Sequence, residues 1–126
     1  MVGLVIVSHS RKLAEGVLDA TRIMAEGCPV AIAGGADDGG YGTSYEKIRS
    51  AVREVYSEDG VIVLVDMGSA VMTTEMVLEE LGYGNVLLLD CPLAEGAIAA
   101  SVSSVCGDSL EVVKQQALSA KTEAKW

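Results

Sequence analysis

Aromatic and basic residues are scarce in this sequence. Its 126 residues include four tyrosines, one tryptophan and no phenylalanine, so the chain lacks an aromatic platform on which nucleic-acid bases stack. Nine lysines and arginines stand against 18 aspartates and glutamates, which gives a formal net charge of -9. This surplus of negative charge argues against nucleic acid or an anionic membrane as a partner.

Long hydrophobic runs are absent as well. No apolar run approaches the ~20 residues that a transmembrane helix needs. The apolar run from Val2 to Val7 has no basic leader before it and is too short for the core of a signal peptide. We therefore expect a cytoplasmic protein with no membrane partner.

The chain has few residues that bind metals or cofactors. Its three cysteines, Cys28, Cys91 and Cys106, form no Cys-x-x-Cys motif, and the single histidine cannot supply a multi-histidine zinc site. No phosphate-binding P-loop and no Gly-x-Gly-x-x-Gly motif after a strand is present. We expect no metal and no nucleotide cofactor on this chain, and we interpret Cys91 as a small buried hydrophobe rather than a reactive thiol.

Apolar runs alternate with helical patterns along the whole chain. Strands are predicted at residues 2–7, 30–33, 61–65 and 86–89. Helices are predicted from near residue 10 to 26, from 43 to 55, at about 70–82, at 97–106 and from 108 onward. No linker divides the chain, so we expect one domain over residues 1–126 with a solvated tail from about residue 121.

Local patterns predict where several helices begin and which faces they bury. Capping-box spacing pairs Thr43 with Glu46 and Asp108 with Glu111. The segment 90–96 is interpreted as a loop before the helix at 97–106. Apolar residues recur at helical spacing in the first helix, at Leu13, Val17, Ala20 and Met24.

The fold class follows from this alternation. We predict a doubly wound α/β domain with a mainly parallel sheet of four or more strands, in the order 2-1-3-4, and helices on both faces. In that order strands one and three are neighbours, and the loops after them flank one crevice. His9 follows strand one and Asp66 follows strand three, so we expect the two side chains within hydrogen-bonding reach.

An aspartate beside a histidine has a chemical use. A carboxylate that accepts the hydrogen of one ring nitrogen fixes the tautomer and leaves the other nitrogen free to attack. A helix amino terminus nearby suits an incoming phosphate. We therefore predict His9 and Asp66 as catalytic residues. The candidate phosphate-binding residues are Ser10, Gly35, Thr43, Ser44 and Ser69.

Each of these residues also has a purely structural interpretation. A lone histidine at a strand end is structural about as often as functional, and Asp66 alone would serve as a helix cap. The Gly34-Gly35 pair more often marks tight backbone geometry than a phosphate site, and Asp37-Asp38 is more typical of a turn than of a cation site. The joint placement of His9 and Asp66 favours the functional interpretation.

Four motifs resemble one known family. They are Val-Ser-His-Ser at 7–10, Gly-Gly at 34–35 with Gly-Thr-Ser at 42–44, Asp-Met-Gly-Ser-Ala at 66–70, and Pro-Leu-Ala-Glu-Gly-Ala at 92–97. In order and spacing they are similar to those of the DhaM family. These proteins are the phosphotransferase subunits of phosphoenolpyruvate-dependent dihydroxyacetone kinases, and their domain is related to the mannose-type IIA domains of the sugar phosphotransferase system.

The resemblance implies a role for each site residue. His9 would accept a phosphoryl group from the phosphocarrier HPr and pass it to ADP held on a separate subunit, DhaL. The expected contact of Asp66 with the nearer ring nitrogen favours the nitrogen remote from the backbone as the one phosphorylated. The resulting ATP would phosphorylate dihydroxyacetone bound on DhaK. Asp66 would orient the ring, and Ser69 would assist the phosphate. The resemblance also implies a homodimer, for which the apolar helix at 97–106 is a candidate contact.

Two alternatives stay open. A mannose-type IIA domain would use the same histidine but pass the phosphoryl group to a IIB domain for sugar uptake, and Gly-Thr-Ser with Pro-Leu-x-Glu-Gly-Ala favours the DhaM family over it. A non-catalytic regulatory module of receiver-like topology would be modified on Asp66. That module normally needs an acidic pair after strand one, where this chain has Ser8 and His9.

Overall fold

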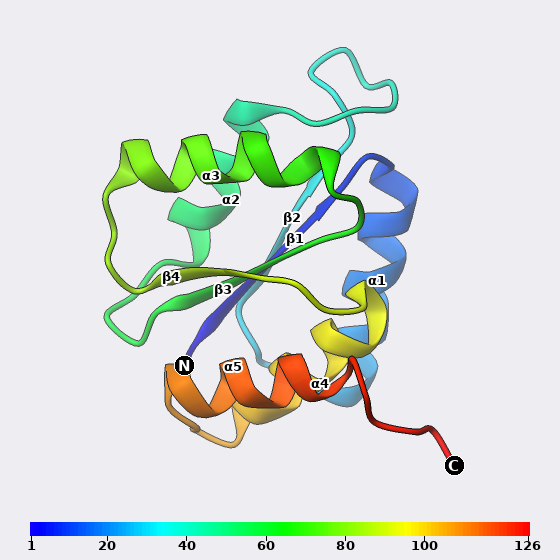
Figure 1. The fold of residues 1–126 in the computed structure, drawn as a ribbon, viewed down its shortest axis with the longest axis vertical. Helices are drawn as coiled ribbons and strands as arrows, with labels where there is room; N and C mark the ends of the chain where they lie inside the picture. Colours follow the sequence, from blue (N-terminus) through cyan, green and yellow to red (C-terminus); the bar gives the residue numbers. More distant parts are fainter.

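The computed structural model describes residues 1–126 as a parallel sheet between two layers of helices (Figure 1). The strands are β1 (Gly3–Ser8), β2 (Val30–Gly34), β3 (Val61–Val65) and β4 (Val86–Leu89). The helices are α1 (Arg11–Met24), α2 (Tyr45–Val55), α3 (Ser69–Leu81), α4 (Leu93–Val105) and α5 (Leu110–Ser119). The sheet order is β2-β1-β3-β4 and all three strand pairs are parallel, which confirms the predicted fold class and order.

Each strand buries side chains on both faces of the sheet. Val5, Val7 and Val63 belong to a core cluster with residues of α2 and α3, whereas Ile6 and Leu64 belong to a second cluster with residues of α1, α4 and α5. Successive strand residues point to opposite faces. The continuous apolar runs are therefore explained by helices that cover both sides, and α2 and α3 lie opposite α1, α4 and α5 (Figure 1).

Both capping-box predictions are wrong by one residue. The N-cap of α2 is Ser44, whose hydroxyl accepts from the backbone N–H of Lys47, and the N-cap of α5 is Ser109. Two adjacent residues at each helix start have side chains that can cap it. The N-cap is the one whose backbone is extended and directly precedes the first helical residue. Asp108 instead accepts a hydrogen bond of 2.7 Å from the hydroxyl of Ser103.

Two other local predictions need correction. Helix α4 begins at Leu93 rather than at residue 97, because Pro92 occupies the N-cap and lacks only an N–H that a helix start leaves unpaired. The buried face of α1 consists of Ala14, Val17 and Thr21, so Leu13 and Met24 are exposed. Val17 is buried as predicted and Ala20 is partly buried, whereas the positions of Leu13 and Met24 on the buried face are taken by the neighbouring Ala14 and Ala25.

The end of the chain lies on the surface. Residues 121–126 are all exposed, although Lys121 lies 3.6 Å from Asp90 and Lys125 lies 3.3 Å from Glu95. None of the helices combines the length and the apolar character that crossing a bilayer requires.

Candidate active site

His9 and Asp66 meet at the carboxyl ends of two adjacent strands. Residue Val7 of β1 is in register with Val65 of β3, so the residues that follow emerge side by side. The Nδ1 atom of His9 lies 3.0 Å from Oδ1 of Asp66, and the backbone N–H of His9 donates to Oδ2 over 3.1 Å. Only 18% of the His9 side chain and 7% of the Asp66 side chain are exposed. One carboxylate thus fixes both the ring and the backbone of the histidine.

Ser8 completes this arrangement, and the sequence-based reasoning missed it. Its buried hydroxyl donates to Oδ2 of Asp66 over 2.9 Å and accepts from the backbone N–H of Ser10 over 3.0 Å. The available signal was a single polar residue at the end of an apolar strand, directly before the candidate nucleophile. A buried hydroxyl there needs a partner, and the nearest carboxylate supplies it.

These hydrogen bonds keep Asp66 ionised. Burial by itself raises the pKa of a carboxyl group. Here the hydrogen bonds from the His9 ring, the Ser8 hydroxyl and the His9 N–H outweigh that effect and hold the pKa of Asp66 below its usual value. An ionised carboxylate only accepts hydrogen bonds, so Nδ1 carries the proton and Nε2 carries the free lone pair.

The lone pair of Nε2 faces the first turn of α3. The hydroxyl of Ser69 lies 2.7 Å from Nε2 and donates to it when Nδ1 is protonated. Gly68, the N-cap of α3, provides no side-chain cap. The backbone N–H groups of Met67, Gly68 and Ser69 have no acceptor within the protein, so they are available for the oxygens of a phosphoryl group.

The glycine-rich loop between β2 and α2 supports the site through its backbone. The N–H of Gly35 donates to the carbonyl of Ser8 and the N–H of Gly42 donates to the carbonyl of His9, each over 3.0 Å. Gly35 has φ of +78°, and a Cβ there would lie 2.9 Å from the carbonyl oxygen of Gly40. Because the amide of Gly35 is already bonded, its contribution to phosphate binding stays a prediction, and its observed role is to shape the loop.

The side chains of the remaining predicted residues form no hydrogen bond with His9. Ser10 caps α1 by accepting from Leu13 N–H over 3.3 Å, and Ser44 both caps α2 and donates to Asp37. Thr43 is partly buried. No hydrogen bond joins these three side chains to His9, so the structure brings together His9, Asp66 and Ser69 only.

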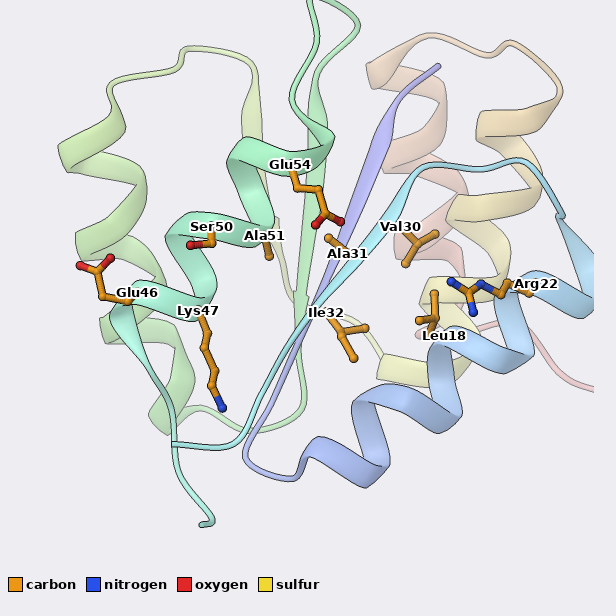
Figure 2. A pocket seen from close by; sticks show the side chains of 10 residues that line it. All are labelled: Leu18, Arg22, Val30, Ala31, Ile32, Glu46, Lys47, Ser50, Ala51 and Glu54. Carbon is orange, nitrogen blue, oxygen red and sulfur yellow. The ribbon is translucent and has the colours of Figure 1, made fainter. Parts of the chain in front are cut away.

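Lys47 fastens the glycine-rich loop to α2. Its Nζ donates to the carbonyl oxygens of Gly34 and Ala36 over 3.1 and 2.9 Å. Lys47 also lines a surface cleft of about 440 Å³ between α1, the edge strand β2 and α2 (Figure 2). None of the predicted site residues lines this cleft, so it is separate from the His9 site.

The structure favours a packing role for Cys91. The residue is half-buried, and burial together with the negative charge of Asp90 raises the pKa of Cys91 to about 11. The nearby Gly96 leaves room for the thiol, since a Cβ on Gly96 would lie 2.5 Å from Sγ. No cluster of three or more histidine, cysteine, aspartate or glutamate residues is arranged to hold a metal ion.

A family model and several relatives match nearly the whole of this chain. Residues 3–114 match the model of the EIIA-man family, described as the PTS system fructose IIA component. The chain is 42% identical over 133 residues to the phosphoryl donor subunit DhaM of the phosphoenolpyruvate-dependent dihydroxyacetone kinase of Escherichia coli, with 98% of this chain aligned. It spans only 28% of the length of that relative.

A shorter relative and a solved structure match over nearly their whole length. The DhaM subunit of dihydroxyacetone kinase 1 of Listeria innocua is 36% identical over 111 residues, which cover 88% of each chain. A crystal structure of a protein of unknown function superposes with a TM-score of 0.86 at 26% identity, and covers 100% of this chain and 99% of the other.

Proposed function

Because the chain belongs to the EIIA-man family of phosphotransferase-system IIA components, we propose that it is a phosphoryl carrier that serves a dihydroxyacetone kinase. The observation that carries this proposal is the placement of His9, with Nδ1 bonded to Asp66 and Nε2 2.7 Å from the hydroxyl of Ser69 in the first turn of α3. We infer the link to a dihydroxyacetone kinase from the names of the relatives from Escherichia coli and Listeria innocua, which are phosphoryl donor subunits of such kinases.

The first half-reaction loads His9. The lone pair of Nε2 attacks the phosphorus atom of a phosphorylated donor, for which HPr is the proposed protein, and the bond between phosphorus and the donor nitrogen breaks. The imidazole then carries a positive charge, which the ionised Asp66 stabilises across the Nδ1–H bond. Ser69 and the N–H groups of residues 67–69 would bind the phosphoryl oxygens.

The second half-reaction unloads it. The N–P bond breaks, its electron pair returns to Nε2, and the ring leaves as a neutral imidazole because Nδ1 keeps its proton. We propose that the acceptor is ADP held on DhaL, and that the resulting ATP serves dihydroxyacetone on DhaK. Positioning and charge account for such catalysis, so the proposal requires no metal or nucleotide resident on this chain.

We also propose that the chain acts as a homodimer in the cytoplasm. The outer side of α4 carries the partly exposed Ile98 and Ala99, which line a hollow of about 750 Å³ with Met24; charged residues of α4 and of the chain end, Glu95, Glu123 and Lys125, line it too. Apolar side chains on an outer face suit a subunit contact. Sedimentation of the wild type and of Ile98→Glu tests this contact, because the charged variant should shift to the monomer.

A reconstitution experiment tests the proposed function. Incubation with phosphoenolpyruvate, enzyme I and HPr should place an acid-labile phosphate on His9, and His9→Ala should abolish it. An acyl phosphate on Asp66, which hydroxylamine removes, would support the receiver-like alternative instead. Loaded protein offered an ADP-loaded DhaL and a IIB domain should transfer to the former, and transfer to the IIB domain alone would favour the mannose-type alternative.

A further inference from the structure

The main chain of His9 is held by hydrogen bonds from both of its neighbouring strands' loops. On the side of β2, the N–H of Gly42 donates to the carbonyl of His9 and the N–H of Gly35 donates to the carbonyl of Ser8, each over 3.0 Å. On the side of β3, the carboxylate of Asp66 accepts from the N–H of His9 over 3.1 Å. Both backbone polar groups of His9 are therefore bonded, and the glycine-rich loop supplies one of the two bonds.

These backbone contacts contribute to the position of Nε2. The contact between Nδ1 and Asp66 sets the rotation of the ring, but the ring is displaced whenever the main chain that carries it moves. Nε2 lies 2.7 Å from the hydroxyl of Ser69 on a different element, α3, so a shift of the His9 backbone relative to α3 changes that distance. Attack needs reacting atoms about 3–3.5 Å apart and aligned, and a misplacement of about 1 Å can lower a rate by roughly 100-fold.

The glycine-rich loop needs support from outside itself. Five of residues 34–44 are glycine, and glycine loses more conformational freedom on ordering than any other residue. Tyr41 in the middle of the loop is 90% exposed, so no burial of its ring holds the loop in place. The N–H of Ala36 donates to the carbonyl of Gly40 over 2.8 Å. That bond fixes the shape of the loop but not its position on the protein.

Lys47 supplies this support through its side chain and its backbone. The side chain extends from the first turn of α2 (Figure 2), and Nζ donates to the carbonyl oxygens of Gly34 and Ala36 over 3.1 and 2.9 Å. The backbone N–H donates over 3.1 Å to the hydroxyl of Ser44, which donates in turn to Asp37. The ammonium group forms no ion pair. Hydrogen bonds from a charged donor are stronger than neutral ones, so the two loop carbonyls are held firmly.

We propose that Lys47 is a positioning residue for phosphoryl transfer, which holds the glycine-rich loop against the end of β1 and thereby holds Nε2 of His9 where it attacks. This inference rests on the proposed function. Lys47 acts through the loop, because its hydrogen bonds go to Gly34 and Ala36 and not to the ring. It serves both half-reactions, since the same Nε2 forms the N–P bond in the first and takes back the electron pair in the second.

Phosphoramidate, a small donor that needs no protein docking surface, tests the inference. Nε2 attacks its phosphorus atom, the P–N bond of the reagent breaks and ammonia leaves. Lys47→Met keeps an unbranched side chain that suits a helix but removes the donors, and it should slow phosphorylation of His9 by about tenfold or more. Lys47→Arg keeps a cationic donor and should recover most of the rate. The matched control is Lys114→Met, at a partly buried lysine of α5 on the opposite side of the sheet, which should react as the wild type does.

Two further measurements distinguish positioning from other causes. In hydrogen exchange followed by NMR, the N–H groups of Gly35 and Gly42 should exchange faster in Lys47→Met than in the wild type, whereas those of α5 should not change. The loss of rate should persist at high salt, because salt screens the attraction between a distant cation and an anionic donor but does not correct a misplaced nitrogen. Urea unfolding under the assay conditions shows whether each variant is folded.

The inference fails if Lys47→Met reacts with phosphoramidate at the wild-type rate, if the loss disappears at high salt, or if Lys47→Arg does not recover the rate. Should Lys47→Met be unfolded, Lys47→Gln takes its place, and unfolding of both would assign Lys47 to the stability of the whole fold and overturn the inference. Wild-type protein that reacts with phosphoramidate but takes no phosphate from HPr would contradict the proposed donor, while a slower Lys47→Met would still support the inference.

Discussion

The carboxylate of Asp66 holds His9 at two points, with Oδ1 3.0 Å from the ring Nδ1 and Oδ2 3.1 Å from the backbone nitrogen. The contact with Nδ1 sets the tautomer and the rotation of the ring about its Cβ–Cγ bond. The contact with the backbone nitrogen fixes the carboxylate itself relative to the end of β1, so the two contacts together define the position of Nε2. The chemistry of His9 therefore depends on a residue 57 positions away along the chain.

Asp66→Asn should slow the loading of His9. The amide keeps the shape of the side chain, but it cannot stabilise the ring cation, and its NH₂ group can oppose the required tautomer. We expect a loss on the order of 100-fold or more in the rate of phosphorylation by HPr. Asp90→Asn, at the exposed end of β4, is the matched control and should load at the wild-type rate. A rate for Asp66→Asn within twofold of the wild type would rule out the orienting role.

Ser8→Ala should weaken the site without removing the nucleophile. The change deletes a donor to Asp66 and leaves the N–H of Ser10 without its acceptor. We expect a loss of about 1–3 kcal/mol in the free energy of unfolding and an upward shift in the pKa of Asp66, measured by NMR titration of its carboxyl carbon. Ser101→Ala deletes a buried hydroxyl bonded only within α4, so it should leave that pKa unchanged.

Acid should remove the stabilisation that Asp66 supplies. Its pKa is lower in the folded protein than in the unfolded chain, so this contribution is present above the unfolded value of about 3.9 and is lost as the pH falls through the folded value. Urea denaturation from pH 7 to pH 3 measures the effect. The stability difference between the wild type and Asp66→Asn should shrink below about pH 4. A difference that grows with acid would contradict the assignment.

Gly35→Ala and Gly39→Ala separate two costs of a side chain in the glycine-rich loop. Both positions have positive φ, +78° and +85°, but only at Gly35 does a Cβ meet a backbone oxygen, that of Gly40 at 2.9 Å. Gly39→Ala should lose about 1 kcal/mol of stability through backbone strain, and Gly35→Ala should lose more. Thermal and urea unfolding of the two variants provide the comparison, and equal losses would show that the contact with Gly40 is relieved.

Thiol labelling should rank the three cysteines. Cys106 is exposed, whereas Cys28 and Cys91 are partly buried. Burial raises the pKa of Cys28, and burial with the charge of Asp90 raises the pKa of Cys91 to about 11. The thiolate is the reactive form, so at pH 7.5 a disulfide reagent should label Cys106 first. Peptide mapping identifies the labelled residue, and early labelling of Cys91 would restore the reactive interpretation.

The sequence predicted the sheet and the central pair because their signals are strong. Apolar runs located the four strands, and the rules of doubly wound sheets then placed His9 beside Asp66. Cap positions failed because Thr43 and Ser44 have the same chemistry, and only the helix register chooses between them. Ser8 and Lys47 were missed for another reason. Their roles depend on contacts with Asp66 and with the carbonyls of Gly34 and Ala36, which no local pattern records.

The hydrogen bond between Ser69 and Nε2 of His9 would change when His9 is phosphorylated. If a phosphoryl group is attached to Nε2 as proposed, the Ser69 hydroxyl, 2.7 Å from that nitrogen, loses its acceptor there and would donate to a phosphoryl oxygen instead. In the proposed cycle the carboxylate side of His9 would keep its hydrogen bonds, so the start of α3 is where we expect the phosphorylated and unphosphorylated forms to differ most. The proposed donor and acceptor proteins would then distinguish the two forms at this point.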